Sequence, residues 1–179
     1  MIEIRPLPTL GHFQNDWLNA HHHFSFGEYM DRDRMGVGPL RVWNDDTIIA
    51  KGGFPPHSHR DMEIITYVRH GAISHEDNLG NRGRTEAGDV QIMSAGTGIQ
   101  HSEFNVEDES TQIFQIWITP DCEGHTPRWE TRTFPRGEHA GALVMLASGR
   151  TMDAGAEVPI IHQDAALFGA TLGAGQSVT

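Results

Sequence analysis

The chain has 179 residues and a formal net charge of −11, the balance of 24 acidic side chains against 13 Lys and Arg. This length suffices for one well-cored domain, and the acidity argues against direct contact with nucleic acid or anionic membranes. The single cysteine, Cys122, excludes an intrachain disulfide framework, and no apolar run approaches the roughly 18 residues of a membrane helix. The N-terminus carries charges and lacks the apolar core of a secretory signal, so we expect a cytoplasmic protein.

The first half of the chain consists of short strand-forming stretches separated by turn residues. Residues 40–50 hold two such stretches around three consecutive polar residues, which predicts a hairpin. Residues 63–69 are rich in β-branched and aromatic side chains, and Gly71 predicts a turn into a partner strand at residues 73–77. The Gly- and Asn-rich residues 77–83 then predict a loop.

The second half continues this pattern and shows no long 3.6-residue apolar period. A Gly-rich segment at residues 94–98 precedes the most apolar stretch, residues 112–119, which we expect to be a buried central strand. Residues 120–140 are polar and contain Pro and Gly, which is typical of a linker. New β-like patterning begins at residues 142–148 and 159–172. These features predict an all-β protein built as an antiparallel barrel or a double-sheet sandwich.

Two short segments each place two possible metal ligands two residues apart. The first contains His57 and His59, and the second contains His101 and Glu103. In extended backbone, side chains two residues apart point to the same side, so each segment presents a pair of ligands. Three neutral imidazoles and one carboxylate suit iron, nickel, copper, manganese or zinc, and do not suit calcium. We therefore predict that the four side chains hold one transition-metal ion.

Asp61 and Glu63 are rival carboxylates, because they share the parity of the first histidine pair. In continuous extended backbone Glu63 would lie about 13 Å from His59, whereas Glu103 would lie about 7 Å from His101. We prefer Glu103 as the carboxylate ligand and keep Glu63 as the second candidate.

The remaining candidates for chemistry have simpler interpretations. The consecutive histidines at residues 21–23 alternate in direction along an extended chain, so we expect partly exposed polar residues rather than a metal site. His75, His125 and His162 have no spaced partner and are expected at the surface or between strands. Cys122 has no base nearby in the sequence, and the chain contains neither a nucleophile elbow nor a phosphate loop.

Four blocks of the sequence resemble the signature segments of the pirin family. These blocks are residues 34–47, 53–68, 88–105 and 115–120. The likeness covers nearly the whole chain and is greatest to bacterial pirin-like proteins described as quercetin 2,3-dioxygenases. It implies a cupin fold, that is, a double-stranded β-helix or jelly-roll barrel, in a bicupin chain whose second barrel is incomplete. Ser94 departs from the usual cupin pattern, which has proline at this position.

The resemblance also implies a domain organisation and a cofactor. Residues 1–135 would form the N-terminal metal-binding cupin domain, and residues 136–179 would begin a truncated C-terminal cupin domain. Family members bind iron through three histidines and a glutamate, which falls on Glu103 here. We therefore expect one divalent transition metal, Fe(II) first, with Ni, Cu, Mn and Zn as alternatives. An incomplete second barrel would favour a protein partner or a homo-oligomer.

The function implied is that of a metal-dependent quercetin (flavonol) 2,3-dioxygenase, which opens the ring with release of carbon monoxide. Its substrates would be a flat aromatic flavonol and dioxygen, with Glu103 as the catalytic base. We expect apolar side chains to line the substrate pocket: Phe54, Met93, Ile99, Phe104 and Ile116. Two alternatives come from other classes of protein. One is a non-enzymatic metal-binding or redox-sensing regulator that acts through a protein partner, and the other is a zinc-dependent cupin sugar isomerase.

Overall fold

The computed structural model describes residues 3–133 and 142–178. Within them the chain forms thirteen strands and two short 3-10 helices, Leu7–Thr9 and Thr151–Asp153. No helix in the described part is long and apolar enough to cross a membrane. The predicted all-β class is therefore confirmed.

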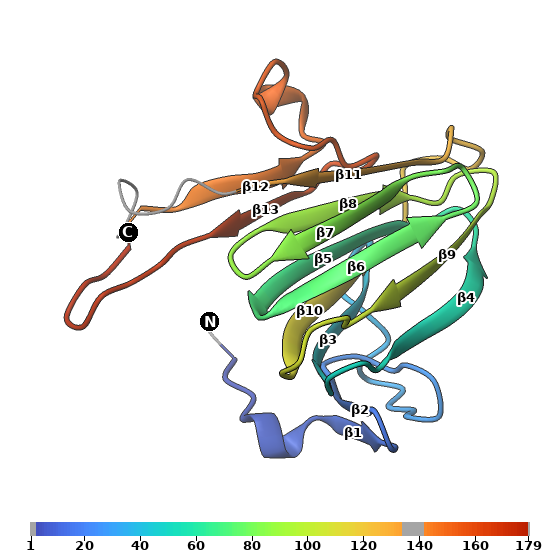
Figure 1. Cartoon of the computed structure of the whole chain (residues 1–179). Coiled ribbons are helices and arrows are strands. Elements are labelled where there is room, and N and C mark those ends of the chain that lie inside the picture. Colours follow the sequence, from blue (N-terminus) through green and yellow to red (C-terminus); the bar gives the residue numbers. More distant parts are fainter. Residues whose placement is uncertain (1–2, 134–141, 179) are drawn as a thin grey trace.

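Eleven of these strands build two sheets that lie against each other (Figure 1). The larger sheet has the order β1-β2-β3-β10-β5-β8-β11. Its strands are β1 Gly11–Gln14, β2 Leu18–His22, β3 Leu40–Ile48, β10 Thr111–Ile118, β5 Glu63–His70, β8 Val90–Ser94 and β11 Arg128–Arg132. The smaller sheet has the order β4-β9-β6-β7, formed by β4 Gly53–His59, β9 Ile99–Phe104, β6 Ala72–Asp77 and β7 Arg82–Glu86. All neighbouring strands pair antiparallel, as in the cupin barrel predicted from the sequence.

Strand β10 occupies the middle of the larger sheet and confirms the predicted central strand. It pairs with β3 on one side and β5 on the other. Side chains on one face of these strands point at the smaller sheet: Thr66 of β5 and Gln115 of β10 both hydrogen-bond Glu103 of β9. The interior between the two sheets is therefore partly polar at the level of β9.

The hairpin predicted at residues 40–50 is wrong, because the segment is one continuous strand, β3. Its three polar residues obey the alternation of a strand: Asn44 and Asp46 are buried on the inner face, whereas Asp45 lies on the outer face and pairs with Arg69. Polar residues in the middle of a strand mimicked a turn signal. The turn predicted at Gly71 is confirmed, with a backbone φ of 72° that favours glycine.

The linker predicted at residues 120–140 is also wrong in part, because Arg128–Arg132 form β11. This strand pairs with β8 and extends the larger sheet by one strand. The segment that leads into β11 passes close to Gly96. A Cβ added at Gly96, where φ is 43°, would lie 1.9 Å from the His125 carbonyl oxygen, so this position requires glycine. The predicted domain boundary between residues 135 and 136 lies outside the described residues.

The C-terminal segment supplies a two-stranded sheet of β12 (Val144–Ser148) and β13 (Ala166–Gly169), in agreement with the predicted β patterning. Ala147 and Ile161 from this region join a buried cluster with Ile65 of β5. Ile65 adjoins Thr66, which faces the smaller sheet, so the C-terminal segment covers the outer face of the larger sheet. This packing buries β5 on both faces. The division into two cupin domains stays a prediction.

Candidate metal centre

The two predicted ligand pairs lie on neighbouring antiparallel strands of the smaller sheet. His57 and His59 belong to β4, and His101 and Glu103 belong to β9. The register places His57 opposite His101, after an irregularity that spans the two prolines before His57. In both strands the residues two apart face the interior, so the parity argument from the sequence agrees with the structure.

Three imidazoles form a compact cluster. The nitrogen atoms that His57, His59 and His101 can offer to an ion all lie within 4.8 Å of one another. The ring centroids are 4.7 Å apart for His57 and His59, 4.5 Å for His57 and His101, and 5.0 Å for His59 and His101. His101 is buried and the other two rings are half-buried at the edge of a cavity. The three rings therefore surround one position that remains accessible from the cavity.

Hydrogen bonds behind the cluster indicate which nitrogen carries the proton in two of the rings, His57 and His101. The Pro55 carbonyl oxygen, which can only accept, lies 2.8 Å from His57 Nδ1, so this nitrogen donates and His57 Nε2 keeps a free lone pair. Behind His101, Asp77 Oδ2 lies 3.0 Å from His75 Nε2, and His75 Nδ1 lies 3.3 Å from His101 Nδ1. When His75 Nε2 donates to Asp77, the Nδ1 lone pair of His75 can accept from His101 Nδ1. His101 Nε2 then keeps its lone pair as well.

The two free lone pairs face each other across the cluster. His57 Nε2 and His101 Nε2 are 3.1 Å apart, and the hydrogen bonds just described leave no proton between them. Two imidazole nitrogens that bind one ion at about 2.1 Å and at a right angle lie about 3 Å apart. The donor set and its spacing therefore fit a divalent transition metal.

The electrostatics of the cluster favour the metal-binding form of the rings. Burial, followed by the neighbouring imidazoles, lowers the pKa of His59 to about 4 and that of His101 to about 3. Both rings are therefore neutral near pH 7, and a neutral imidazole is the form that coordinates metal.

Glu103 lies beside this cluster and is held by hydrogen bonds from three strands. Its Oε1 accepts from Thr66 Oγ1 at 3.1 Å and from Gln91 Nε2 at 2.5 Å, and its Oε2 accepts from Gln115 Nε2 at 2.9 Å. The side chain is 1% exposed, and a carboxylate oxygen lies within 4.8 Å of a His101 nitrogen. Glu103 lines the same cavity as the three imidazoles. Its Oε2 accepts one hydrogen bond, whereas its Oε1 accepts two.

Glu63, the second candidate for the carboxylate, points away from the cluster. Its neighbour Ile64 lines the cavity, so Glu63 faces the other side of β5. Its carboxylate accepts from Ser94 Oγ at 2.8 Å and lies 3.2 Å from His162 Nδ1.

The sequence interpretation missed the role of His75, which was expected at the surface or between strands. It is 3% exposed, stacks on Trp129 at 4.8 Å between ring centroids, and bridges Asp77 to His101. The spacing offered a hint, because His75 and Asp77 lie two residues apart and therefore point to the same face of β6, the strand beside β9. Spacing alone does not tell whether that face is buried or exposed, so the role of His75 could not be predicted from it.

A further group of possible ligands lies in an exposed loop. Cys122 Sγ is 3.2 Å from His125 Nε2, which is 2.7 Å from Asp121 Oδ1, so the thiol does have a base nearby. Partial desolvation and the Asp121 carboxylate raise the pKa of the Cys122 thiol, which disfavours a reactive thiolate. Asp61 accepts a hydrogen bond from the backbone of the same loop and takes no part in the metal cluster.

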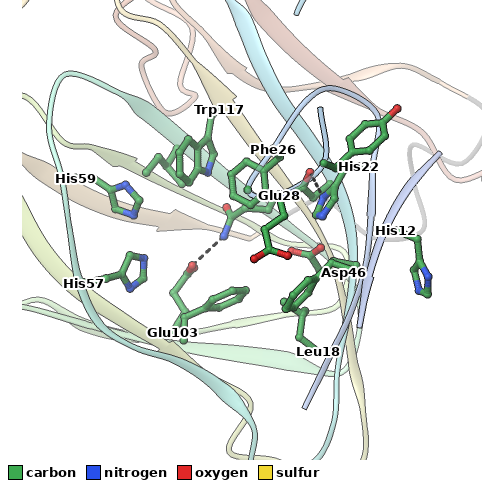
Figure 2. A pocket seen from close by; sticks show the side chains of 18 of the residues that line it. His12, Leu18, His22, Phe26, Glu28, Asp46, His57, His59, Glu103 and Trp117 are labelled. Atoms are coloured by element: carbon green, nitrogen blue, oxygen red, sulfur yellow. Dashed lines mark hydrogen bonds between the residues drawn. The ribbon is translucent and has the colours of Figure 1, made fainter. Parts of the chain in front are cut away.

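The imidazole cluster and Glu103 open onto a cavity of about 510 Å³. This volume lies within the range of about 300–1,000 Å³ that is usual for small-molecule sites. The lining side chains combine eight aromatic or aliphatic groups with ten imidazole, amide or carboxyl groups: His12, Phe13, Leu18, Ala20, His22, Phe26, Glu28, Tyr29, Asn44, Asp46, Phe54, His57, His59, Ile64, His101, Glu103, Gln115 and Trp117. Figure 2 shows His57 and His59 on one side of this cavity and His22 and Asp46 on the other.

The predicted pocket lining is correct for Phe54 only. Met93 and Ile99 pack in a separate buried cluster, and Ile116 belongs to the cluster on the outer face of the larger sheet. The fifth predicted residue, Phe104, is not among the lining side chains either. Aromatic side chains from the N-terminal third line the cavity instead, and two of them, Phe26 and Tyr29, come from the loop between β2 and β3.

His22 is the clearest departure from the exposed surroundings expected for residues 21–23. It is 4% exposed, lines the cavity and places Nδ1 2.9 Å from Asn44 Oδ1. Burial lowers the pKa of His22, so the ring is neutral in this environment.

Comparisons with known proteins agree with this fold. A family model described as Pirin matches residues 4–118. A Pseudomonas aeruginosa protein, provisionally named quercetin 2,3-dioxygenase PA1210, is 62% identical over 177 residues, which are 99% of this chain and 75% of that protein. An Escherichia coli K12 protein named quercetin 2,3-dioxygenase is 50% identical over 135 residues, which are 75% of this chain and 58% of that protein.

Among solved structures, this chain is similar to the bacterial pirin YhhW from Escherichia coli in complex with nickel(II). The TM-score is 0.85 at 44% sequence identity, and the match covers 94% of this chain and 70% of that chain. The fold resembles that of a protein whose crystals contain a divalent transition metal.

Proposed function

This chain belongs to the pirin family, and from that premise we propose that it is a metal-dependent dioxygenase that opens the central ring of flavonols such as quercetin. The observation that carries the proposal is the convergence of three imidazoles and Glu103 on one aromatic-walled cavity. The cavity is large enough for a flat aromatic substrate and has an ion-binding cluster at one side.

We propose that His57, His59, His101 and Glu103 hold a single divalent metal ion. Fe(II) is the proposed native ion, and nickel is the first alternative because the similar Escherichia coli pirin binds nickel(II). The cluster faces the cavity at its edge, so a substrate in the cavity would bring its oxygens next to the residues that would hold the ion.

When bound, the metal would polarise the 3-hydroxyl or adjacent carbonyl oxygen of the flavonol and support its reaction with dioxygen. Glu103 would accept the hydroxyl proton on Oε2, which accepts one hydrogen bond where Oε1 accepts two. Gln115 and Gln91 would keep the carboxylate aimed at the substrate. In the net reaction both atoms of dioxygen enter the products, and carbon 3 leaves as carbon monoxide.

The aromatic wall would position the substrate plane. His59 and Trp117 meet edge to face at 5.0 Å between ring centroids, and Trp117 meets Phe26 in the same way at 5.4 Å. A flavonol that lies along this wall would keep its reacting oxygens near the imidazoles and exclude water from them.

The test is oxygen uptake with simultaneous detection of carbon monoxide. The protein is stripped of metal, reloaded separately with Fe(II), Ni(II) or Zn(II), and mixed with quercetin in air. We expect one carbon monoxide per dioxygen consumed with a redox-active ion and none in the metal-free protein. If no loaded form consumes oxygen or releases carbon monoxide, the proposed activity is wrong.

A further inference from the structure

The wall of the cavity remote from His57 and His59 carries a buried carboxyl group that the proposed reaction does not use. Asp46 lies in the middle of β3 and is 2% exposed. Its Oδ1 has no hydrogen-bond partner in the described part of the chain, although the side chain lines the cavity. Most buried polar atoms are paired, so this exception needs an explanation.

The neighbours of Asp46 explain why no protein group pairs with it. Its cross-strand partners are Ala20 on β2 and Ile113 on β10, which have no polar side-chain atoms. Two strand positions away, Asn44 Oδ1 is occupied by His22.

Gln115, the polar residue of β10 that lines the cavity, is engaged elsewhere. Its Nε2 donates to Glu103, and its Oε1 lies 3.0 Å from Thr66 Oγ1. None of these neighbours makes a hydrogen bond to Asp46 Oδ1 in the described part of the chain.

The charge of the cavity indicates what could pair with Asp46. No Lys or Arg is among the lining residues, whereas Glu28 adds a second carboxylate in the same region. An anionic ligand group would be repelled there. A hydroxyl, which can donate to a carboxyl oxygen, suits this end of the cavity.

A row of aromatic side chains connects this end to the imidazole cluster. From His59 the row passes through Trp117 and Phe26 to His22, with successive ring centroids 5.0, 5.4 and 5.3 Å apart (Figure 2). A flat molecule with one end at the imidazoles would extend along this row toward the wall that contains Asp46 and His22.

We propose that Asp46 is a specificity-determining residue, whose carboxyl group hydrogen-bonds a phenolic hydroxyl on an outer ring of the flavonol. This inference deepens the proposed function and rests on it. It makes polyhydroxylated flavonols the preferred ligand class, over analogues that have only the metal-binding oxygens. Burial, followed by the charges of Asp45 and Glu103, raises the pKa of Asp46 to about 8. The carboxyl group is therefore mainly protonated at pH 7 and can both donate to and accept from a hydroxyl.

The test compares quercetin with 3-hydroxyflavone, which keeps the 3-hydroxyl and 4-carbonyl and lacks the outer-ring hydroxyls. Dissociation constants are measured without oxygen on Ni(II)-loaded protein, so that binding is separated from turnover. We expect the wild type to bind quercetin about tenfold more tightly, as one well-formed hydrogen bond allows. The variants Asp46→Leu and Asp46→Val should bind the two flavonols within about twofold of each other, with 3-hydroxyflavone affinity unchanged.

The matched control is Asp45→Asn, the adjacent acid on the outer face of the same strand, where it pairs with Arg69. This control should keep the tenfold preference. A wild type without preference, a preference that survives in both Asp46 variants, or equal losses for both ligands would each overturn the proposal. Because 3-hydroxyflavone binding reports an intact cavity, a misfolded variant cannot imitate the expected result.

Oxygen uptake on Fe(II)-loaded protein separates this inference from the proposed activity. If quercetin is bound with the Asp46-dependent preference but is not oxidised, the dioxygenase activity is wrong and the role of Asp46 stands. If quercetin is oxidised equally well by wild type and Asp46→Leu with the same KM, the activity stands and the role of Asp46 is wrong.

Discussion

The two ends of the cavity treat their buried polar groups in opposite ways. At the imidazole end, His101 and Glu103 are oriented by specific neighbours, and the Nε2 lone pairs of His57 and His101 that remain point at one position. At the far end, Asp46 Oδ1 is buried with no partner in the described structure. One end is organised around an ion, and the other carries an unmet hydrogen-bonding capacity.

This difference separates two kinds of preorganisation. A metal requires several donors at fixed spacing, and outer hydrogen bonds orient ligands here, as Pro55 does for His57 and as Asp77 and His75 do for His101. A substrate hydroxyl requires one group of the right chemistry, and leaving that group unpaired destabilises the free protein until the ligand arrives. Three of the following experiments change residues at the imidazole end and measure metal binding or turnover. The fourth changes Asp46 and measures stability.

We expect the largest effect when one of the four proposed metal ligands is removed. His101→Ala should lower affinity for Ni(II) or Fe(II) by more than about 100-fold, beyond the range typical for outer hydrogen-bonding partners. Metal content after dialysis against a weak chelator measures this. The control is His70→Ala, an exposed histidine at the end of β5, which should retain about one ion per chain. Full metal retention in His101→Ala would exclude this ring as a ligand.

Glu103→Gln tests the proposed proton acceptor at the same end. Turnover per bound metal should fall by about 100-fold or more, because an amide cannot accept the hydroxyl proton. Steady-state oxygen uptake, normalised to metal content, provides the number. Glu76→Gln, on the exposed side of neighbouring β6, serves as the comparison and should leave it unchanged. Undiminished turnover per metal in Glu103→Gln would remove this residue from the proton transfer.

His75→Phe isolates the outer support of His101. Phenylalanine can keep the stacking on Trp129 and cannot accept from His101 Nδ1, so metal affinity should fall by about 10-fold to 100-fold while the fold persists. Competition with a metal-binding dye measures the affinity. Trp129→Phe alters the stacking and keeps the hydrogen bond, and its affinity should stay near that of the wild type. Equal losses in both variants would assign the effect to packing.

The last experiment concerns Asp46 and measures the stability of the metal-free protein instead of metal binding or turnover. Because the folded-state pKa is raised to about 8 from 3.8, the unfolded chain loses this proton first, and wild-type stability falls as pH rises from about 4 to 8. Asp46→Asn removes this loss. Its advantage in urea unfolding should grow by about 1.4 kcal/mol per pH unit within that range and level off above pH 8. An advantage that stays constant between pH 5 and pH 7 would contradict the buried, protonated state.

Much of the fold and of the candidate site was predicted from local composition and from the rule that residues two apart on a strand point to the same face. The central strand at residues 112–119 and the two ligand pairs follow from apolar runs and from residues two apart, which are local properties of extended chain. Spacing along extended chain also favoured Glu103 over Glu63, and the resemblance to the pirin family supported that choice and supplied the cupin fold. Parity could not place Asn44, Asp45 and Asp46, because polar residues inside a strand look like a turn until the buried polar cavity is known.

What the amino-acid sequence determined by itself was the β class and the two short segments with metal-ligand chemistry, because alternation and residue type are encoded locally. The tertiary structure alone decided which face of each strand is interior. It thereby turned Glu63 toward His162, brought His75 behind His101, and left Asp46 unpaired between Ala20 and Ile113. These outcomes depend on strands distant in sequence that pair and stack, and no local pattern specifies which side chains such strands bring together.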